Sequence, residues 1–379
     1  MTETRPQLEA ARRLVVKIGS ALLVDEESRG LRRPWLDALS DDLAALKAGG
    51  SEIIVVSSGA IALGRHQLGL HRRSMRLEES QAAAATGQIQ LAHAYQETLD
   101  RHEIAVAQIL LTLEDTEERR RHLNARSTLG TLLRMGILPV INENDTVATA
   151  TIRVGDNDRL AARVAAMMNA DVLVLLSDID GLYTSDPRRN PEAEFVPLVP
   201  AITPDILAMA GEAPPGYSSG GMVTKLEAAR IAVSGGCNMV IADGRQANPL
   251  AAVSEGARCT WFLAEIEPLT ARKRWIAGTL KPKGLVRVDA GALAALERGK
   301  SLLPAGVTAV EGQFERGDTV LVRDPEGREV ARGLIAYSSD DAGRILGHKS
   351  REFEAVLGYR GREELIHRDD LVLIRGRST

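Results

Sequence analysis

The sequence predicts an α/β fold: a sandwich in which helices cover both faces of a mainly parallel sheet, followed by a small β-rich domain. Two observations predict the sandwich. Short runs of Val, Ile and Leu alternate with longer segments of helical spacing, and these runs are continuously apolar, as in strands buried on both faces. A third observation predicts the second domain, because after residue 282 the chain becomes a series of short strands separated by glycine turns.

The same patterns place the elements in order. Apolar runs predict strands at 14–19, 52–59, 104–111, 137–142, 171–178 and 237–243. Helical spacing predicts helices at 34–48, 77–99, 115–135, 156–169 and 224–234. Residues 147–155 alternate in the manner of a strand, which predicts a local hairpin.

The domain boundaries follow from a change in the sequence pattern after Trp261. Segment 263–284 is charged and contains two prolines, as is typical of a linker or a connecting helix. We therefore expect an α/β domain at 1–265, a linker at 266–282 and a β-rich domain at 283–374.

The composition is that of a soluble globular protein. Of 379 residues, 44% are hydrophobic and 26% are charged, and the net charge of −4 gives no general attraction to nucleic acid or to an anionic membrane. The N-terminal stretch lacks the apolar core of a signal peptide, and no run is long enough to span a membrane. Since Cys237 and Cys259 are the only cysteines, neither a disulfide framework nor a zinc site is expected. These features predict a cytoplasmic protein.

Three glycine-rich segments are candidates for binding phosphate. No two glycines are separated by a single residue, which excludes the Rossmann and protein-kinase glycine loops. The candidates lie where a strand ends or a helix begins, and they are Lys17 with Gly19, Ser58 with Gly59, and 218–230 with Lys225. Taken singly, each has an ordinary structural alternative, either a solvated surface charge or a helix cap.

An acidic cluster occupies 141–158, which reads INENDTVATATIRVGDND. Glu143, Asp145, Asp156 and Asp158 are crowded around one arginine, Arg153, with three asparagines among them. Because buried carboxylates are costly unless they are paired, the cluster is either a solvated loop or a site. Placed on one sheet edge with the three glycine-rich segments, it suggests that the ligands are ATP and an amino acid.

Taken together, these motifs resemble the amino acid kinase family. The segments that carry the resemblance are KIGS, VVSSGAIALG, INENDTVAT with VGDND, LLSDIDGLYTSDP and SGGMVTK, in this order. The resemblance covers nearly the whole chain, and residues 283–361 resemble a PUA domain. It implies the amino acid kinase fold, and transfer of the γ-phosphoryl group of ATP, with Mg²⁺, to the side-chain carboxylate of L-glutamate, the first step of proline biosynthesis.

The resemblance also implies roles for individual residues. Lys17 and Lys225 would be catalytic and contact the phosphates, and Asp158 would organise them. The nucleotide-binding positions would be Lys17, Gly19, Ser177, Asp178, Ser219, Gly220, Gly221, Met222, Val223, Thr224 and Lys225. The substrate-binding positions would be Ser58, Gly59, Asp145, Asp156 and Asn157, and no residue is assigned to a metal. The chain departs from the family pattern at Arg153 and Ser219, where relatives usually have Lys and Thr.

The resemblance further implies a homo-oligomer, dimeric or tetrameric, that L-proline inhibits through the loop at 142–157. It also implies a functional link to a γ-glutamyl phosphate reductase, because an acyl phosphate is reactive in water. Two alternatives stay open: a different acceptor such as aspartate, acetylglutamate or a nucleoside monophosphate, and RNA binding by the C-terminal domain. Residues 281–379 carry 17 Lys and Arg against 16 Asp and Glu with no basic stripe, so direct RNA binding is not expected.

Overall fold

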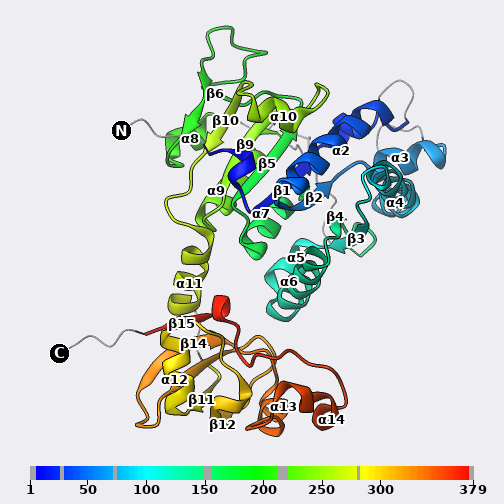
Figure 1. Cartoon of the computed structure of the whole chain (residues 1–379). Helices are drawn as coiled ribbons and strands as arrows, with labels where there is room; N and C mark the ends of the chain where they lie inside the picture. The colour runs from blue at the N-terminus through cyan, green and yellow to red at the C-terminus, as the bar shows by residue number, and fades with distance from the viewer. Residues whose placement is uncertain are drawn as a thin grey trace. The chain divides into compact units, whose positions relative to one another are not determined.

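The structure of the chain is a computed structural model, which describes residues 6–25, 30–70, 75–147, 156–211, 221–279 and 282–374. The chain divides into two compact units, Met1–Pro268 and Leu269–Thr379 (Figure 1). None of the helices within the described ranges combines the length and the apolar character that crossing a membrane requires.

The first unit is built on an eight-stranded sheet. Its strands lie in the order β3 (Val106–Leu111), β4 (Leu138–Glu143), β2 (Glu52–Ser57), β1 (Arg13–Ile18), β5 (Val172–Ser177), β9 (Asn238–Asp243), β10 (Cys259–Phe262) and β8 (Leu198–Val199). Neighbouring strands from β3 to β9 are parallel, whereas β10 runs antiparallel to β9. The predicted sandwich with a mainly parallel sheet is therefore confirmed.

Helices cover both faces of this sheet. One face packs against α2 (Arg33–Ala48), α4 (Leu77–Asp100) and α10 (Pro249–Ser254), and the other against α6 (Arg119–Arg134), α7 (Asp156–Met168) and α9 (Met222–Ser234). Successive side chains of a strand point to opposite faces. In β1, Leu14 and Val16 therefore join the α2 core, while Val15 joins the α7 core. The same alternation directs Lys17 toward α7 and α9.

Shorter elements connect these layers. They are α1 (Ser20–Leu23), α3 (Ala60–Gln67), α5 (Leu113–Glu117) and α8 (Pro204–Ala208), together with a two-stranded sheet of β6 (Leu182–Tyr183) and β7 (Phe195–Val196). Helix α11 (Pro268–Thr279) lies in the segment for which a linker or connecting helix is expected.

Most predicted elements are confirmed, and the structure differs from the prediction at one helix and at short strands. The helix predicted at 115–135 is two helices, because Glu118 leaves the helical conformation and its side chain caps α6 by accepting from the N–H groups of Arg120 and Arg121. Strands β8 and β10 were not expected, since their apolar runs are short. The predicted hairpin at 147–155 falls almost wholly outside the described residues.

Two glycines let α3 and α4 touch backbone to backbone. A Cβ on Gly64 would collide with the carbonyl oxygen of Ala83, and a Cβ on Gly87 would collide with the carbonyl oxygen of Ala60. Since any side chain at either position would push the helices apart, only glycine allows this crossing. The two helices lie side by side in Figure 1, and α3 follows directly from the end of β2.

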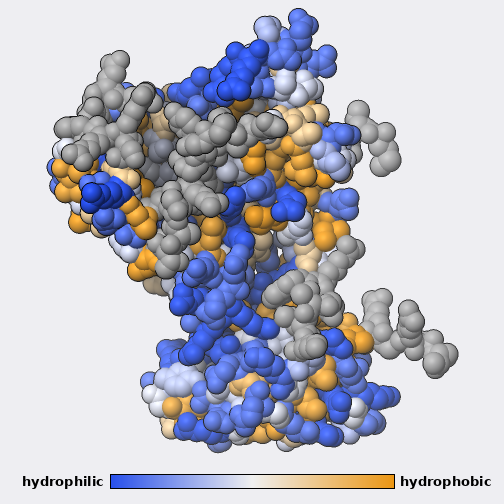
Figure 2. All heavy atoms as spheres, turned by 180° about the vertical axis from the view of Figure 1, so that it is seen from behind, coloured by the Kyte–Doolittle hydropathy of each residue, from blue (hydrophilic) through white to orange (hydrophobic). Residues whose placement is uncertain are grey.

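The second unit has its own five-stranded sheet and its own core. The strand order is β12 (Val307–Gly312), β11 (Gly284–Val288), β13 (Thr319–Arg323), β14 (Glu329–Leu334) and β15 (Leu371–Leu373). Three short helices, α12 (Ala290–Glu297), α13 (Ser339–Arg344) and α14 (Phe353–Leu357), accompany the predicted strands. On the face drawn in Figure 2 the surface of this unit is mostly hydrophilic, with small separate hydrophobic patches.

Candidate active site

The carboxyl ends of the parallel strands bring the predicted site residues to one sheet edge. Lys17 is the fifth of six residues in β1 and is level with Val56 of β2 and Leu175 of β5. Ser58 follows β2, Asn142 and Glu143 end β4, and Ser177 ends β5. Open α/β sheets bind their ligands at this edge.

Three charged side chains meet there. The Lys17 Nζ lies 2.6 Å from Oδ1 of Asp158, and the Lys225 Nζ lies 3.2 Å from its Oδ2. Asp158 and Lys225 occupy the first turns of α7 and α9, on the face of the sheet toward which Lys17 points. One carboxylate is thus shared by two ammonium groups that come from segments more than 200 residues apart.

Burial makes this cluster electrostatically strong. Asp158 is 1% exposed, and each lysine is 7% exposed. Burial alone would raise the pKa of the Asp158 carboxyl, but the positive charges of Lys17 and Lys225 outweigh it and lower the pKa to about 2. Burial lowers the pKa of the Lys17 ammonium, and Asp158 opposes part of that shift. The carboxylate is therefore ionised at neutral pH.

Thr224 supports the carboxylate from the start of α9. Its hydroxyl lies 3.2 Å from Oδ2 of Asp158 and 2.9 Å from the carbonyl oxygen of Gly221, so it can donate to either one. Gly221 is the N-cap of α9, and a Cβ there would meet no atom of the described residues within 4 Å. The first N–H groups of α9 have no carbonyl partner within the helix, and Gly221, Met222 and Val223 line the cavity described next.

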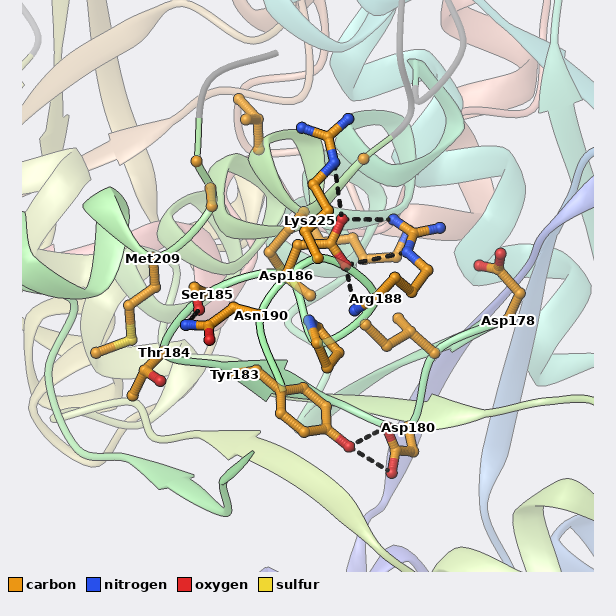
Figure 3. Close-up of a pocket in the computed structure, with 18 of the residues that line it drawn as sticks. Asp178, Asp180, Tyr183, Thr184, Ser185, Asp186, Arg188, Asn190, Met209 and Lys225 are labelled. Carbon is orange, nitrogen blue, oxygen red and sulfur yellow. Dashed lines mark hydrogen bonds and ion pairs between the residues drawn. The ribbon is translucent and has the colours of Figure 1, made fainter. Parts of the chain in front are cut away.

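A cavity of about 980 Å³ adjoins the cluster. Its wall is formed by the segment after β5, by residues around α8 and by the first turn of α9, and Lys225 is part of it (Figure 3). Asp178, whose carboxylate accepts from Ser177 Oγ at 3.1 Å, also lines it. This volume is within the range of sites that hold a cofactor-sized ligand.

Two arginines in the cavity wall are held by aspartates of their own loops. Arg188 bonds to both oxygens of Asp186 at 3.0 and 3.2 Å, and Arg245 bonds to both oxygens of Asp243 at 2.9 and 2.7 Å. These pairs raise the pKa of each guanidinium and lower that of each carboxyl. Each guanidinium is therefore fixed in place, with its charge balanced by its own aspartate.

Two residues of the wall, Asp180 and Tyr183, belong to an aromatic and ionic cluster that also includes Phe195 and Arg258. The hydroxyl of Tyr183 donates to Asp180 at 3.1 Å, and Asp180 also lies 3.3 Å from the Arg258 guanidinium. That guanidinium stacks over the Phe195 ring, 4.2 Å from its centroid, and over the Tyr183 ring at 5.3 Å. Asp180 and Tyr183 lie in the motif LLSDIDGLYTSDP, whereas Phe195 and Arg258 belong to none of the motifs and are brought to it only by the fold.

On the other side of Lys17, amide side chains form a chain of hydrogen bonds. Asn157 Nδ2 donates to Ser58 Oγ at 2.9 Å and to Asn142 Oδ1 at 3.1 Å. Asn142 Nδ2 in turn donates to Gln88 Oε1 at 2.7 Å. This chain links the ends of β2 and β4 and the start of α7 to the middle of α4.

Comparison with known proteins identifies the family. A sequence profile of the amino acid kinase family matches residues 12–243, more than half of the chain. The chain belongs to the amino acid kinase family. A profile of the PUA domain matches residues 284–357, so this kinase carries a PUA domain in its second unit.

Curated relatives of this amino acid kinase share most of its sequence. A glutamate 5-kinase of Paramagnetospirillum magneticum is 63% identical over 97% of this chain and 99% of its own. Glutamate 5-kinases of Agrobacterium fabrum and Gluconobacter oxydans are 60% and 59% identical, over 98% and 97% of this chain and 96% and 97% of their own. The similarity therefore includes both units.

The structure places most of the predicted site residues of this kinase and corrects one expectation. Gly19 is the N-cap of α1, where a Cβ would lie 3.9 Å from Lys17 Nζ, and Met222 and Val223 line the cavity. The N–H of Ser58, expected to be available for an anion, donates to the carbonyl oxygen of Ile18 at 3.1 Å. The cap of α3 is Gly59 at φ 109°, a conformation that favours glycine, so Ser58 is not the cap.

Several predicted residues of the kinase cannot be placed. Arg153, Ser219 and Gly220 lie outside the described residues, and Asp156 is described only as the first residue of α7. Asp145 is buried in the turn after β4. The roles assigned to all these positions remain predictions.

The lowered pKa of Asp158 predicts that acid removes part of the stability. The ordinary pKa of 3.8 applies to the unfolded chain and about 2 to the folded one, so the stabilisation is present above the unfolded value and is lost as the pH falls through the folded value. It amounts to roughly 2 kcal/mol, at about 1.4 kcal/mol per pKa unit. We expect the difference in free energy of unfolding between the wild type and Asp158→Asn, measured by urea titration, to narrow by that amount from about pH 5 to about pH 2. If the difference in free energy of unfolding stayed constant over this pH range, the lowered pKa of Asp158 would be contradicted.

Proposed function

We propose that this protein is a glutamate 5-kinase, which transfers the γ-phosphoryl group of ATP to the side-chain carboxylate of L-glutamate in the first step of proline biosynthesis. The observation that carries the proposal is the buried carboxylate of Asp158, which holds two lysines beside a large cavity. The names of relatives that are 59 to 63% identical over nearly the whole chain support glutamate as the acceptor.

The chemistry suits a site without a general base. The acceptor carboxylate has an ordinary pKa of about 4.3, so it is already ionised at neutral pH. One of its oxygens attacks the γ-phosphorus, the bond to the bridging oxygen of ADP breaks, and no proton has to move. What the protein must supply is alignment and relief of the repulsion between two anions. Lys17 and Lys225 are placed to supply that positive charge.

We place the nucleotide in the cavity next to Lys225. The first turn of α9 offers backbone N–H groups to phosphate oxygens, and Lys225 adds a cation to the same turn. Arg188 and Arg245 add two guanidinium groups to the wall, each held in place by an aspartate. Tyr183 and Asp180 give the same wall an aromatic and a polar group, which suits a nucleobase.

Mg²⁺ is expected to arrive with the nucleotide. Among the described residues no three acidic, histidine or cysteine side chains converge into a cage for a metal ion. Mg²⁺ typically relies on substrate phosphates, water and one or two carboxylates. Of the three aspartates on the cavity wall we assign this role to Asp178, because Asp180 and Asp186 are already paired with arginines. When bound, the ion would neutralise phosphate charge.

We place the acceptor at the other side of Lys17, where Ser58 and Asn157 meet and where Asp145 and Asp156 lie nearby in sequence. Feedback inhibition by L-proline through 142–157, a homo-oligomeric state and a link to a γ-glutamyl phosphate reductase are further parts of the proposal. They rest on the resemblance to the family.

The test is release of ADP from Mg-ATP with L-glutamate, L-aspartate, N-acetylglutamate or UMP as the acceptor. We expect turnover with L-glutamate, suppressed by added L-proline. Turnover with a different acceptor would confirm kinase activity and refute L-glutamate as the substrate. Turnover with glutamate that proline leaves unchanged would refute only the inhibition, and silence with all four acceptors would refute the proposed function.

A further inference from the structure

We infer that Gln88, in the middle of α4, is a positioning residue that sets which way the amide of Asn157 faces the acceptor substrate. The inference rests on the proposed function, because it concerns the same acceptor site. Gln88 belongs to none of the glycine-rich or acidic motifs, and it is only 8% exposed. Its side-chain carbonyl accepts from Asn142, which is 3% exposed.

The orientation of every amide in the chain follows from one backbone group. The N–H of Glu143 can only donate, and it lies 2.9 Å from the side chain of Asn142, so the atom it meets must be the oxygen, Oδ1. The Nδ2 of Asn142 therefore faces Gln88, and the atom of Gln88 that accepts from it must be the side-chain carbonyl oxygen. Because Oδ1 of Asn142 is an acceptor, the atom of Asn157 that faces it must be the donor Nδ2.

This orientation leaves a defined pattern for the substrate. Nδ2 of Asn157 is used by Asn142 and by Ser58, and Oδ1 of Asn157 is buried with no hydrogen-bond partner among the described residues. A buried oxygen without a donor is costly, so it calls for a donor from a ligand. The hydroxyl of Ser58 accepts from Asn157, and its own hydrogen can be given to an acceptor. Asn157 thus fits the ammonium of an amino acid, and Ser58 fits a carboxylate.

Gln88 prevents the side-chain amides of Asn142 and Asn157 from exchanging the positions of their oxygen and nitrogen atoms. Without its carbonyl oxygen, Nδ2 of Asn142 would be buried with nothing to donate to, and the Asn142 amide would turn away to find a partner. Asn157 would then lose the acceptor that fixes its own amide. Gln88 can hold its place because the neighbouring Gly87 presses α4 directly onto α3.

The experiment compares L-glutamate with glutarate, which has the same two carboxylates and no ammonium. Gln88→Met keeps the length of the side chain and removes the acceptor. We expect the KM for L-glutamate to rise about tenfold and the preference for L-glutamate over glutarate to shrink by a similar factor. The KM for ATP should stay within about twofold of the wild-type value, because Gln88 has no part in the nucleotide cavity. Gln88→Glu, which retains an acceptor oxygen, should preserve the preference.

The control is Gln90→Met on the same helix. Gln90 is exposed and donates to Gln67 rather than to the chain of amides, so its substitution should change neither KM nor the preference. A Gln88→Met enzyme that unfolds normally and keeps the wild-type preference would overturn the inference. So would a Gln88→Glu enzyme that loses the preference as Gln88→Met does. A wild-type enzyme that does not turn over L-glutamate would instead refute the proposed function and this inference with it.

Discussion

Replacing Lys225 by alanine is expected to lower kcat by about 10²–10³-fold, while the KM for L-glutamate changes much less. The ammonium of Lys225 lies at the boundary between the cavity and Asp158, where negative charge moves from the γ-phosphoryl group toward ADP during transfer. The acceptor amides lie on the other side of Lys17 and are left intact. Steady-state kinetics with each substrate varied in turn would measure the two effects separately.

Lys300→Ala provides the matched control for this experiment. Lys300 is an exposed lysine of the second unit, so the same change of charge there should leave kcat unaltered. The assignment of Lys225 to phosphoryl transfer would be wrong if Lys225→Ala raised only the KM for L-glutamate and kept the wild-type kcat.

Asp158→Asn is expected to destabilise the protein by roughly 3–5 kcal/mol, because it keeps the shape of the side chain and removes its charge. Two ammonium groups, each 7% exposed, would then share no counter-ion. The cost arises from leaving buried charges uncompensated, so it greatly exceeds the value of a surface pair. The measurement is the free energy of unfolding in urea at neutral pH without nucleotide.

Asp41→Asn is the control, since the Asp41 carboxylate also contacts two basic side chains. Its carboxylate is 2.6 Å from Arg101 and 2.9 Å from His102, but its side chain is 49% exposed. We expect a loss below about 1 kcal/mol there. If the two variants lost the same free energy of unfolding, burial would not strengthen the Asp158 cluster.

The parallel sheet is the reason that sequence patterns could place the glycine-rich and acidic motifs at one edge, whereas the roles of Lys17, Asp158 and Lys225 came from the resemblance to the family. Lys17, Asp158 and Lys225 lie in three motifs far apart in the chain, yet each follows or lies near a strand whose carboxyl end reaches the same edge. Once the strands are known to be parallel, that edge is the place where these motifs must meet. The direction of β10 could not be predicted in this way, because apolar runs do not distinguish parallel from antiparallel pairing.

The sequence could not predict Gln88 or the aromatic and ionic cluster. Helical spacing in α4 predicts which side of the helix is buried, but a buried glutamine in that pattern resembles any other interior position. Its partner, Asn142, lies 54 residues away and is chosen by the crossing of α4 over the end of β4. The pairing of Arg258 with Tyr183 and Phe195 likewise depends on the fold, which brings the residue before β10 against the neighbouring strands β6 and β7.

The glycine contact between α3 and α4 also governs how the acceptor side can move. Helices that touch through their backbones have no layer of side chains over which one could slide, so a rotation of one must carry the other. Ser58 stands at the entrance to α3, and Gln88 stands beside Gly87 in α4. If the kinase closes over its substrates, Ser58 and Gln88, the two ends of the amide chain, will move together. The arrangement of hydrogen-bond donors and acceptors in the acceptor site would then be the same before and after the movement.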